Sequence, residues 1–376
     1  MELDRFRVEL DTWLDEHEAE LLAGRTHDGG LDADMAQLAT VKRLTFDAGW
    51  MRWGWPERVG GLGGSPLLRG YLGEALIERD LVDPGVISLT EVLAPTMIDF
   101  APPELAATYV PRLLRGDENW CQGFSEPGTG SNLGALSCRA ENTGDGWLVN
   151  GQKVWTSLAQ YAQRCVLLVR TGTVEDAHRG ISAMFVDMDT PGISVRPIEA
   201  IHGRPEFSEV FFDDVAVPAD RLLGNEGDGW AAAMDLLPYE RSTALWQRGA
   251  FLQRRLGDLV AEVPADDVST AELGATYSSL FTLRARSRAT QYRLDVGERL
   301  GPETSIDKIL LATTEQQLFD LVADSLPTEV LVADDSRARA WRTDTIYSRA
   351  ASIYGGSSEI QRNIVARRLL DLGADR

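Results

Sequence analysis

The spacing of apolar residues divides the chain into three stretches. From the start to about Gly116, apolar residues recur three and four positions apart, as in "MAQLATVKRLTFDAGWM" and "LLRGYLGEALIERDL", a period typical of amphipathic helices. The segment "GWPERVGGLGGSP" between them is rich in glycine and proline and predicts a loop. We therefore expect the N-terminal part of the chain to be helical.

Between about Asn119 and Leu223 the apolar period falls to two, which predicts β-strands. "GWLVNGQKVWTS" predicts a hairpin with Asn150 and Gly151 at its turn, because Asn-Gly favours a two-residue turn. Further short strands are expected in "CVLLVRTG", "GISAMFVDMD", "ISVRPIEAI" and "SEVFFDDVAVP". Short strands separated by turn residues predict a small antiparallel barrel or sandwich.

The helical period returns at about Gly229 and continues to the end. "WAAAMDLLPYERSTALWQRGAFLQRRLGDLVAEV" predicts a long helix with a kink at Pro238, because proline lacks an N–H and crowds the preceding turn. "SIDKILLATTEQQLFDLVADSL" predicts a second helix. In the last one, "SSEIQRNIVARRLLDL", Ser358 and Gln361 have the spacing of a capping box.

These patterns together predict an α+β multi-domain fold. We expect an N-terminal α-helical domain at 1–117, a central small antiparallel β-barrel or sandwich at 118–224, and a C-terminal α-helical bundle at 225–376. A length of 376 residues is long for one core and agrees with two or three domains.

Charge and composition narrow the range of partners. A net charge of −21 repels nucleic acid and anionic membranes, so neither is an expected partner. No apolar run is long enough to span a membrane, and the first residues lack the pattern of a secretion signal, so we expect a cytoplasmic location. No metal site is expected, because the histidines do not cluster and the cysteines fit no zinc pattern. These residues are His17, His27, His178, His202, Cys121, Cys138 and Cys165.

Four segments in order resemble the signatures of the acyl-CoA dehydrogenases and span most of the chain. They are "FSEPGTGSNLGAL" at 124–136, "VNGQKVWTS" at 149–157, "FFDDVAVPADRLLGNEGDGW" at 211–230 and "YGGSSEIQRNIVARRLL" at 354–370. The resemblance implies an FAD enzyme that converts an acyl-CoA thioester to the trans-2-enoyl thioester and passes electrons to an electron-transfer flavoprotein. The subgroup it resembles includes members of bacterial lipid and steroid breakdown.

The resemblance also implies how the flavin is held. Ser125 is expected at the pyrimidine end of the flavin, Ser157 at the N5/O4 edge, and Trp155 against the isoalloxazine ring. Without the flanking motifs, Ser125 and Ser157 would be ordinary turn and strand serines, and Trp155 could instead be a core tryptophan.

The loop that begins at Phe124 is expected to carry the rest of the cofactor site. Small residues such as Gly130 let the backbone approach the pyrophosphate, where free N–H groups can bind it. The resemblance places Ser131 near the FAD phosphate or the substrate. Asn132 stands where the family usually has Asp, which keeps the shape but loses the charge. Glu126 is interpreted as a carboxylate that fixes the loop.

The catalytic carboxylate is absent from the position where the family often has it, because that position is Gly355 here. In a subgroup of the family the base lies on the long helix after the β domain, directly before an arginine, and Glu240-Arg241 in "LLPYERSTAL" matches that position. The resemblance therefore implies that Glu240 removes the α-proton. A dry pocket would raise the pKa of such a glutamate toward neutrality.

Other residues around this position are expected to bind the substrate: Tyr239, Arg241, Gly355 and Arg362, with Ser131 from the first loop. Gly355 and Gly356 would leave room for a branched or ring-bearing acyl group. The alternatives are that Glu240 and Arg241 are surface charges and that Arg362 is a surface arginine near a subunit contact. The carrier is CoA or an acyl-carrier protein, and the acidic surface disfavours the latter.

Two segments depart from the family pattern. The Arg-x-x-Phe-Gly and Gln-x-x-Gly-Gly segments, with which a neighbouring subunit usually helps to hold FAD, are not recognisable in residues 257–273 and 326–346. We therefore expect either a homo-oligomer or a heteromer with a second acyl-CoA dehydrogenase-like chain. Two other functions stay open, a non-catalytic partner subunit and a flavin oxidase or monooxygenase on the same scaffold.

Overall fold

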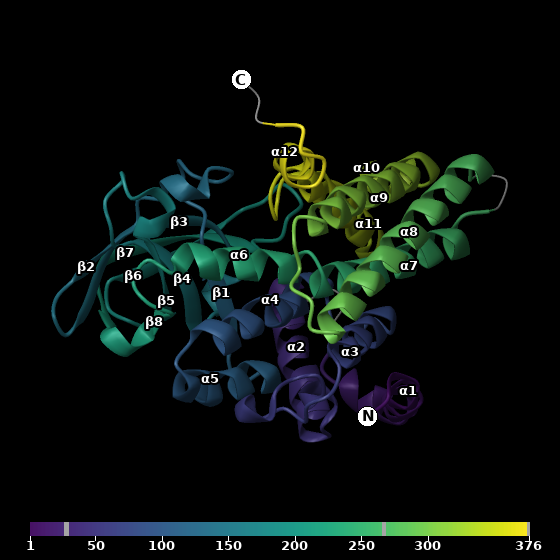
Figure 1. The fold of residues 1–376 in the computed structure, drawn as a ribbon. Helices are drawn as coiled ribbons and strands as arrows, with labels where there is room; N and C mark the ends of the chain where they lie inside the picture. Colours follow the sequence, from purple (N-terminus) through teal and green to yellow (C-terminus); the bar gives the residue numbers. More distant parts are fainter. Residues whose placement is uncertain (26–29, 265–267, 374–376) are drawn as a thin grey trace.

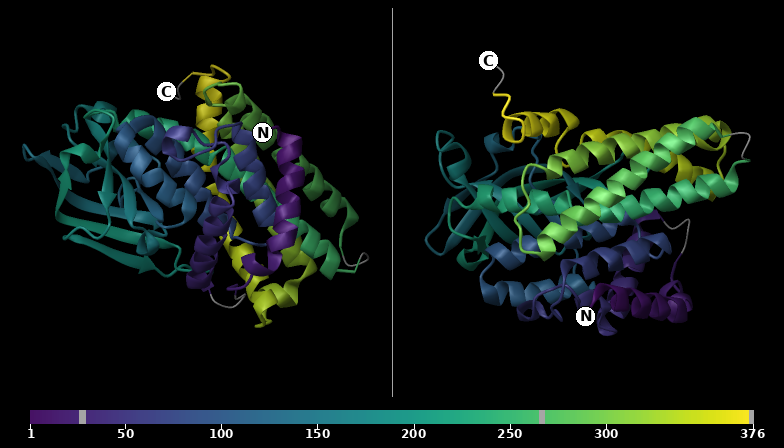
Figure 2. Two further views of the ribbon diagram at one scale, coloured as in Figure 1. Left: turned by 90° about the horizontal axis from the view of Figure 1, so that it is seen from below. Right: turned by 45° about the vertical axis from the view of Figure 1, so that its right-hand side comes forward.

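The computed structural model of this protein describes residues 1–25, 30–264 and 268–373. Its chain runs through an N-terminal set of helices, a central β-sheet and a C-terminal set of longer helices (Figure 1). Seen from two further directions, the sheet lies at one end of the molecule and the two helical parts lie side by side at the other (Figure 2). This layout confirms the predicted fold class.

The described residues of the N-terminal part form five α-helices, two of which begin at a residue whose side chain caps them. They are α1 Leu3–Leu21, α2 Gly30–Asp47, α3 Pro66–Glu78, α4 Pro84–Phe100 and α5 Pro103–Arg115. The side chains of Ser65 and Asp83 accept the free N–H groups at the starts of α3 and α4, and both helices then have proline at the first position. Leucine side chains from these helices fill the core.

The central part is one sheet, which is mostly antiparallel. Its strands are β1 Trp120–Gly123, β2 Arg139–Asn142, β3 Gly146–Ser157, β4 Arg164–Arg170, β5 Ile181–Asp187, β6 Ile193–Ile198, β7 Phe207–Pro218 and β8 Leu222–Leu223. Their order is β6-β7-β3-β2-β4-β5-β8, with β1 parallel to β4 at its side. β4 and β5 are almost wholly buried, which agrees with their continuous apolar sequences.

The predicted hairpin turn at Asn150-Gly151 is wrong. These residues lie in the middle of β3, at a bulge in its pairing with β7. Asn150 exchanges hydrogen bonds with Asp214, and Gly151 lies so close to Cys138 that a Cβ would come 2.7 Å from its Cα. The turn lies instead between β2 and β3, where Gly144 has a φ of 91°. Asn-Gly thus serves a strand irregularity here rather than a turn.

The C-terminal part contains seven α-helices within the described residues. They are α6 Gly229–Glu240, α7 Thr243–Glu262, α8 Thr270–Asp295, α9 Thr304–Ser325, α10 Pro327–Leu331, α11 Ser336–Tyr347 and α12 Ser358–Arg368. The predicted kink at Pro238 takes the form of a break at 241–242, three residues later. Ser242 donates its hydroxyl to the Tyr239 carbonyl, which satisfies a group that the end of the helix frees.

The start of α12 also differs from the prediction by one residue. Ser357, not Ser358, is the capping residue, and its hydroxyl accepts the N–H of Ile360. The side chain of Gln361 does not complete a capping box. It turns back and donates to the carbonyls of Gly355 and Gly356, which therefore fixes the loop before the helix.

The described residues contain neither a membrane-spanning helix nor a cluster of metal ligands. No helix among them is long and apolar enough to cross a membrane. No group of three or more His, Cys, Asp or Glu side chains within the same ranges could hold a metal ion, and His27 lies outside the described residues. The three cysteines are buried and unbonded.

We predict that Gly151→Ala lowers stability by about 1–3 kcal/mol, because the new methyl group meets the Cys138 backbone at a bulge. Gly274→Ala in α8 is the control, because nothing lies within 4 Å of its added Cβ, and it should be neutral or stabilising by up to ~1 kcal/mol. Thermal unfolding of both variants tests this expectation. Equal midpoints would show that the bulge does not need glycine.

Candidate active site

The carboxylate of Glu240 lies at the end of α6 against the loop that precedes α12. A Cβ placed on Gly355 would lie 2.6 Å from Glu240 Oε1, so only a residue without a side chain allows this approach. Gly355 also has a φ of 62°, a conformation that glycine adopts at little cost. The position that lacks the family carboxylate is therefore packed directly against the glutamate predicted to replace it.

Two side chains hold the loop in this place. Arg241 is buried and its Nη2 donates to the Gly355 carbonyl at 3.3 Å. Gln361 Nε2 donates to the carbonyls of Gly355 at 3.0 Å and Gly356 at 3.2 Å. Because the loop has no other side chain at these positions, these donors fix where its backbone lies over Glu240.

A buried lysine from α9 completes the surroundings of Glu240. Lys308 donates to the Ala351 carbonyl, and its Nζ lies 4.3 Å from the centre of the Tyr354 ring. Its Cε would be 3.1 Å from a Cβ on Gly355, so lysine and glutamate flank the same glycine.

The charges around Glu240 act in opposite directions. Burial raises the pKa of the Glu240 carboxyl, and the Arg241 and Lys308 cations partly oppose this rise. Burial lowers the pKa of Lys308 to about 8, against the pull of Glu240 and Glu315. A carboxyl with a raised pKa is suited to accept a proton near neutral pH.

Tyr239 precedes the glutamate and lies on a polar side of α6. Burial raises the pKa of Tyr239 to about 12, and the nearby carboxylates of Asp235 and Asp99 add to this. Burial, followed by the charge of Asp99, raises the pKa of Asp235 to about 6. Tyr239 therefore keeps its hydroxyl proton and can act as a donor.

The loop at 124–126 is anchored to β3. The N–H of Val154 donates to the Ser125 carbonyl at 2.9 Å, and Lys153 Nζ donates to the Phe124 carbonyl at 3.2 Å. These bonds bring Phe124 and Ser125 beside the strand that carries Trp155 and Ser157, so the structure brings these four predicted flavin residues together.

Glu126 is the buried anchor of that loop. It forms an ion pair with Lys153 at 2.8 Å and accepts the N–H groups of Ser137 and Cys138. Burial would raise the pKa of Glu126, but Lys153 and these donors outweigh it and lower the pKa. Glu126 is thus an ionised carboxylate whose contacts all hold the loop in place. This agrees with its interpretation from the sequence as a carboxylate that fixes the loop.

Trp155 is not a core residue. It is 59% exposed, has a φ of 58° at a bulge of β3, and meets Phe207 edge-on at 6.1 Å. Ser157 pairs with Phe207 across the sheet. Gly130 and Ser131 are also exposed, and nothing lies within 4 Å of a Cβ on Gly130. An apolar ring and accessible small residues therefore face open space on this side.

Aromatic contacts connect the sheet to the Glu240 loop. His202, in the connection between β6 and β7, meets Tyr347 at the end of α11 edge-on at 5.5 Å. Tyr347 lies 6.1 Å from Tyr354, the residue before Gly355. Tyr347 therefore contacts both the β6–β7 connection, which leads into Phe207, and the loop over Glu240.

One predicted substrate residue lies apart from this group. Arg362 is 61% exposed on α12, and its nearest ion-pair partner is Glu359 at 3.8 Å. Sequence reasoning missed Lys308 and the role of Gln361. The available signal for Lys308 was its rarity, because the chain has only three lysines.

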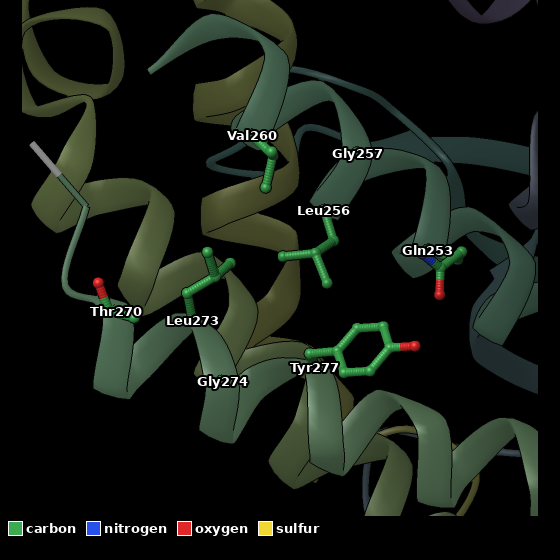
Figure 3. A pocket seen from close by; sticks show the side chains of 8 residues that line it. All are labelled: Gln253, Leu256, Gly257, Val260, Thr270, Leu273, Gly274 and Tyr277. Carbon is green, nitrogen blue, oxygen red and sulfur yellow. The ribbon is translucent and has the colours of Figure 1, made fainter. Parts of the chain in front are cut away.

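An apolar groove of about 440 Å³ lies between the second half of α7 and the start of α8 (Figure 3). It lies far along these helices from the end of α6, where Glu240 is the last residue. Its lining residues are Gln253, Leu256, Gly257, Val260, Thr270, Leu273, Gly274 and Tyr277. The groove borders residues 257–273, which lack the family's Arg-x-x-Phe-Gly segment, and of these 265–267 lie outside the described residues.

Comparison with known proteins agrees with this geometry. The models of the acyl-CoA dehydrogenase N-terminal, middle and C-terminal domains match residues 2–117, 121–215 and 227–370. Acyl-CoA dehydrogenase IpdE1 of Mycobacterium tuberculosis is 37% identical over 99% of this chain and 98% of its own length.

Solved structures give the same result. A variant of the Tcur3481-Tcur3483 steroid acyl-CoA dehydrogenase is 25% identical, with a TM-score of 0.83 over 100% of this chain and 99% of its own. The ChsE4-ChsE5 complex of Mycobacterium tuberculosis contains a chain with the same fold, 24% identical with a TM-score of 0.77 over the whole of both chains. The fold and the relatives define a flavoprotein oxidoreductase. This chain belongs to the acyl-CoA dehydrogenase family.

We predict that Gly355→Ala lowers turnover at least ~10-fold, because the methyl group displaces the Glu240 carboxylate. Stability should fall by only about 1–2 kcal/mol, the cost of a left-handed alanine, since a glutamate side chain can swing away. Gly297→Ala is the matched control: it has a φ of 78° and nothing within 4 Å of its added Cβ. Similar turnover in both variants would contradict a role for the close approach.

Proposed function

We propose that this protein is an FAD-dependent acyl-CoA dehydrogenase that oxidises the α,β bond of an acyl-CoA thioester, with Glu240 as the base. The observation that carries the proposal is the Glu240 carboxylate enclosed beneath Gly355, with its pKa raised by burial. It removes the objection that Gly355 leaves the enzyme without a base.

The proton and the hydride leave neighbouring carbons in this reaction. FAD, when bound, supplies the acceptor for the hydride from the β-carbon, which no side chain can do. Glu240 accepts the α-proton as the double bond forms, and the product is the trans-2-enoyl thioester. The backbone at Gly355 lies against the half-buried carboxylate, and burial raises its pKa, so that its basicity suits removal of a proton from a weak carbon acid.

The residues on the sheet side fit a flavin. The exposed Trp155 offers an apolar face, and Ser125 and Ser157 lie beside it as polar groups for the ring edge. The open space over Gly130 and Ser131 lets their backbone N–H groups approach a pyrophosphate. FAD is therefore proposed as the cofactor, with Phe124 as the buried start of the loop.

Substrate binding is proposed for the residues near Glu240. Tyr239 offers a hydroxyl donor, Arg241 positions the loop, and Gly355 lets the loop backbone lie against the carboxylate. Arg362 is exposed and free to reach the phosphates of CoA. With a net charge of −21, the chain favours CoA over an acidic acyl-carrier protein.

A ring-bearing acyl group is proposed as the substrate. Two adjacent glycines take little space where the family often has a glutamate, and one structural relative is a steroid acyl-CoA dehydrogenase. Electrons are proposed to pass to an electron-transfer flavoprotein. We also propose 1–117, 118–224 and 225–376 as the domains, because the β-strands stand between the two helical sets along the chain.

A second acyl-CoA dehydrogenase-like chain, unlike this one, is the proposed partner at the α7–α8 groove. Val260 and Tyr277 in the groove are each 54% exposed, and Phe281 one turn further along α8 is 65% exposed. Exposed aromatic residues around an apolar groove are typical of a protein interface. The same region lacks a family segment for holding FAD, so a partner would complete the assembly there.

A non-catalytic subunit role is the main competitor, and the missing family segments favour it. The enclosed base and the anchored 124–126 loop favour catalysis, because a merely structural subunit needs neither. Tight binding of flavin and turnover by the assembled protein separate the two functions.

We predict that Glu240→Gln abolishes turnover while flavin binding is unchanged. One positioned base contributes about 10²–10⁴-fold to the rate, and the loss should exceed that contribution. The measurement is anaerobic bleaching of the flavin absorbance by straight-chain and ring-bearing acyl-CoAs. Glu104→Gln on the exposed face of α5 serves as control and should bleach normally. If Glu240→Gln bleaches at the wild-type rate, the proton goes elsewhere.

We predict that Tyr277→Asp weakens assembly with the unlike chain ~10-fold or more, because it places a charge in an apolar contact. The chain is co-expressed with a second acyl-CoA dehydrogenase-like chain of its source organism, and co-purification and flavin content are measured. Val174→Asp, at a 74% exposed valine in the β4–β5 connection, is the control. A homo-oligomer saturated with FAD, formed by this chain alone, would rule out the heteromer.

A further inference from the structure

Lysine occurs in this chain only where it is buried. The protein has 34 arginines and three lysines, Lys42, Lys153 and Lys308, whose exposed fractions are 1%, 0% and 3%. The long surface cations are thus all arginines. Each lysine donates to a backbone carbonyl: Lys42 to Leu113, Lys153 to Phe124 and Lys308 to Ala351. A lysine therefore marks places where a compact ammonium is enclosed.

Lys308 stands across Gly355 from Glu240. A Cβ placed on Gly355 would lie 3.1 Å from Lys308 Cε and 2.6 Å from Glu240 Oε1. The ammonium is directed to the Ala351 carbonyl and the Tyr354 ring, two contacts in the segment that leads into Gly355. No hydrogen bond within the described ranges joins Lys308 to Glu240, so the carboxylate stays free to accept a proton.

The charged groups around this pair leave Lys308 with a distinct role. Glu315 of α9 is paired with Arg248 of α7 at 2.6 Å, so these two charges largely cancel each other. Arg241 keeps its charge at any working pH. Tyr354 and Tyr347 are buried and neutral, because burial raises the pKa of each. Lys308 is therefore the neighbouring cation whose charge can change near neutral pH.

We propose that Lys308 is a positioning residue for the base: its ammonium keeps the Glu240 carboxylate ionised in the resting site and anchors the loop that encloses it. Without this cation, Arg241 alone would oppose the burial that raises the pKa of Glu240, so a smaller fraction of the carboxyl would be ionised and able to accept a proton from the substrate. This inference rests on the proposed function of Glu240 as the base. It adds Lys308 as a group that helps to keep that base ionised.

The sign of the pH effect follows from the charges. Lys308 opposes the burial that raises the pKa of Glu240, so its removal raises that pKa further. Below the Lys308 pKa of about 8 the ammonium is charged and this support is complete. The acid limb of kcat/KM, which reports ionisation of the free base, must then move to higher pH when the charge is lost.

The test compares three variants in the assembled, flavin-loaded enzyme. Lys308→Met should move the acid limb of kcat/KM up by about one pH unit or more, while Lys308→Arg, which keeps the charge, should leave it near the wild-type position. Lys42→Met removes an equally buried ammonium from α2 and should leave the limb unmoved. A loss of rate in Lys308→Met with no shift of the limb would reduce Lys308 to a structural role and overturn the proposal.

A second readout does not depend on turnover. Infrared difference spectra between each protein and its Glu240→Gln counterpart isolate the Glu240 carboxyl band, whose titration should move up in Lys308→Met and stay in Lys308→Arg. If Glu240→Gln retains turnover, the proposed base is wrong, but a shifted titration still supports the interaction. If the titration does not move in Lys308→Met, the electrostatic role of Lys308 is wrong whatever the base is.

Discussion

The helical half of the candidate site depends on one close approach, that of the Glu240 carboxylate to the backbone at Gly355. A side chain at 355 would occupy the place of the Glu240 carboxylate. Only one of the two positions, 240 or 355, can therefore place an acidic side chain there. Arg241 and Gln361 hold the loop, and Lys308 lies on its other side. The buried Arg241 and Lys308 thus both place a positive charge near the Glu240 carboxyl.

The sheet side follows a different physical principle. Glu126 and Lys153 form a buried ion pair whose other hydrogen bonds are satisfied, and this rigid support leaves Trp155 exposed. One half of the candidate site therefore holds a half-buried carboxyl among cations, and the other half carries an exposed apolar ring. A reaction that separates a proton from a hydride needs both, because the proton requires a base of raised pKa and the hydride requires a flavin placed beside it.

Local sequence signals failed where two elements compete for the same residue. Asn150-Gly151 has the chemistry of a tight turn, but Asp214 on β7 pairs with Asn150 and Cys138 crowds Gly151, so the pair stays within a strand. Gln361 has the spacing of a capping residue, but the free carbonyls of the glycine loop take its amide. In each case a contact from a distant part of the chain outweighed a preference that operates over three or four residues.

By itself, the sequence determined the order of helical and β parts and the family to which the chain belongs, and it singled out Glu240 as the candidate base, because periods and motifs are written in neighbouring residues. Only the tertiary structure decided that Arg241 and Gly355, 114 positions apart, share a hydrogen bond, and that Lys308 is buried beside them. The physical reason is that burial and the electrostatic field at a carboxyl are set by groups from separate helices, whose meeting no local pattern encodes.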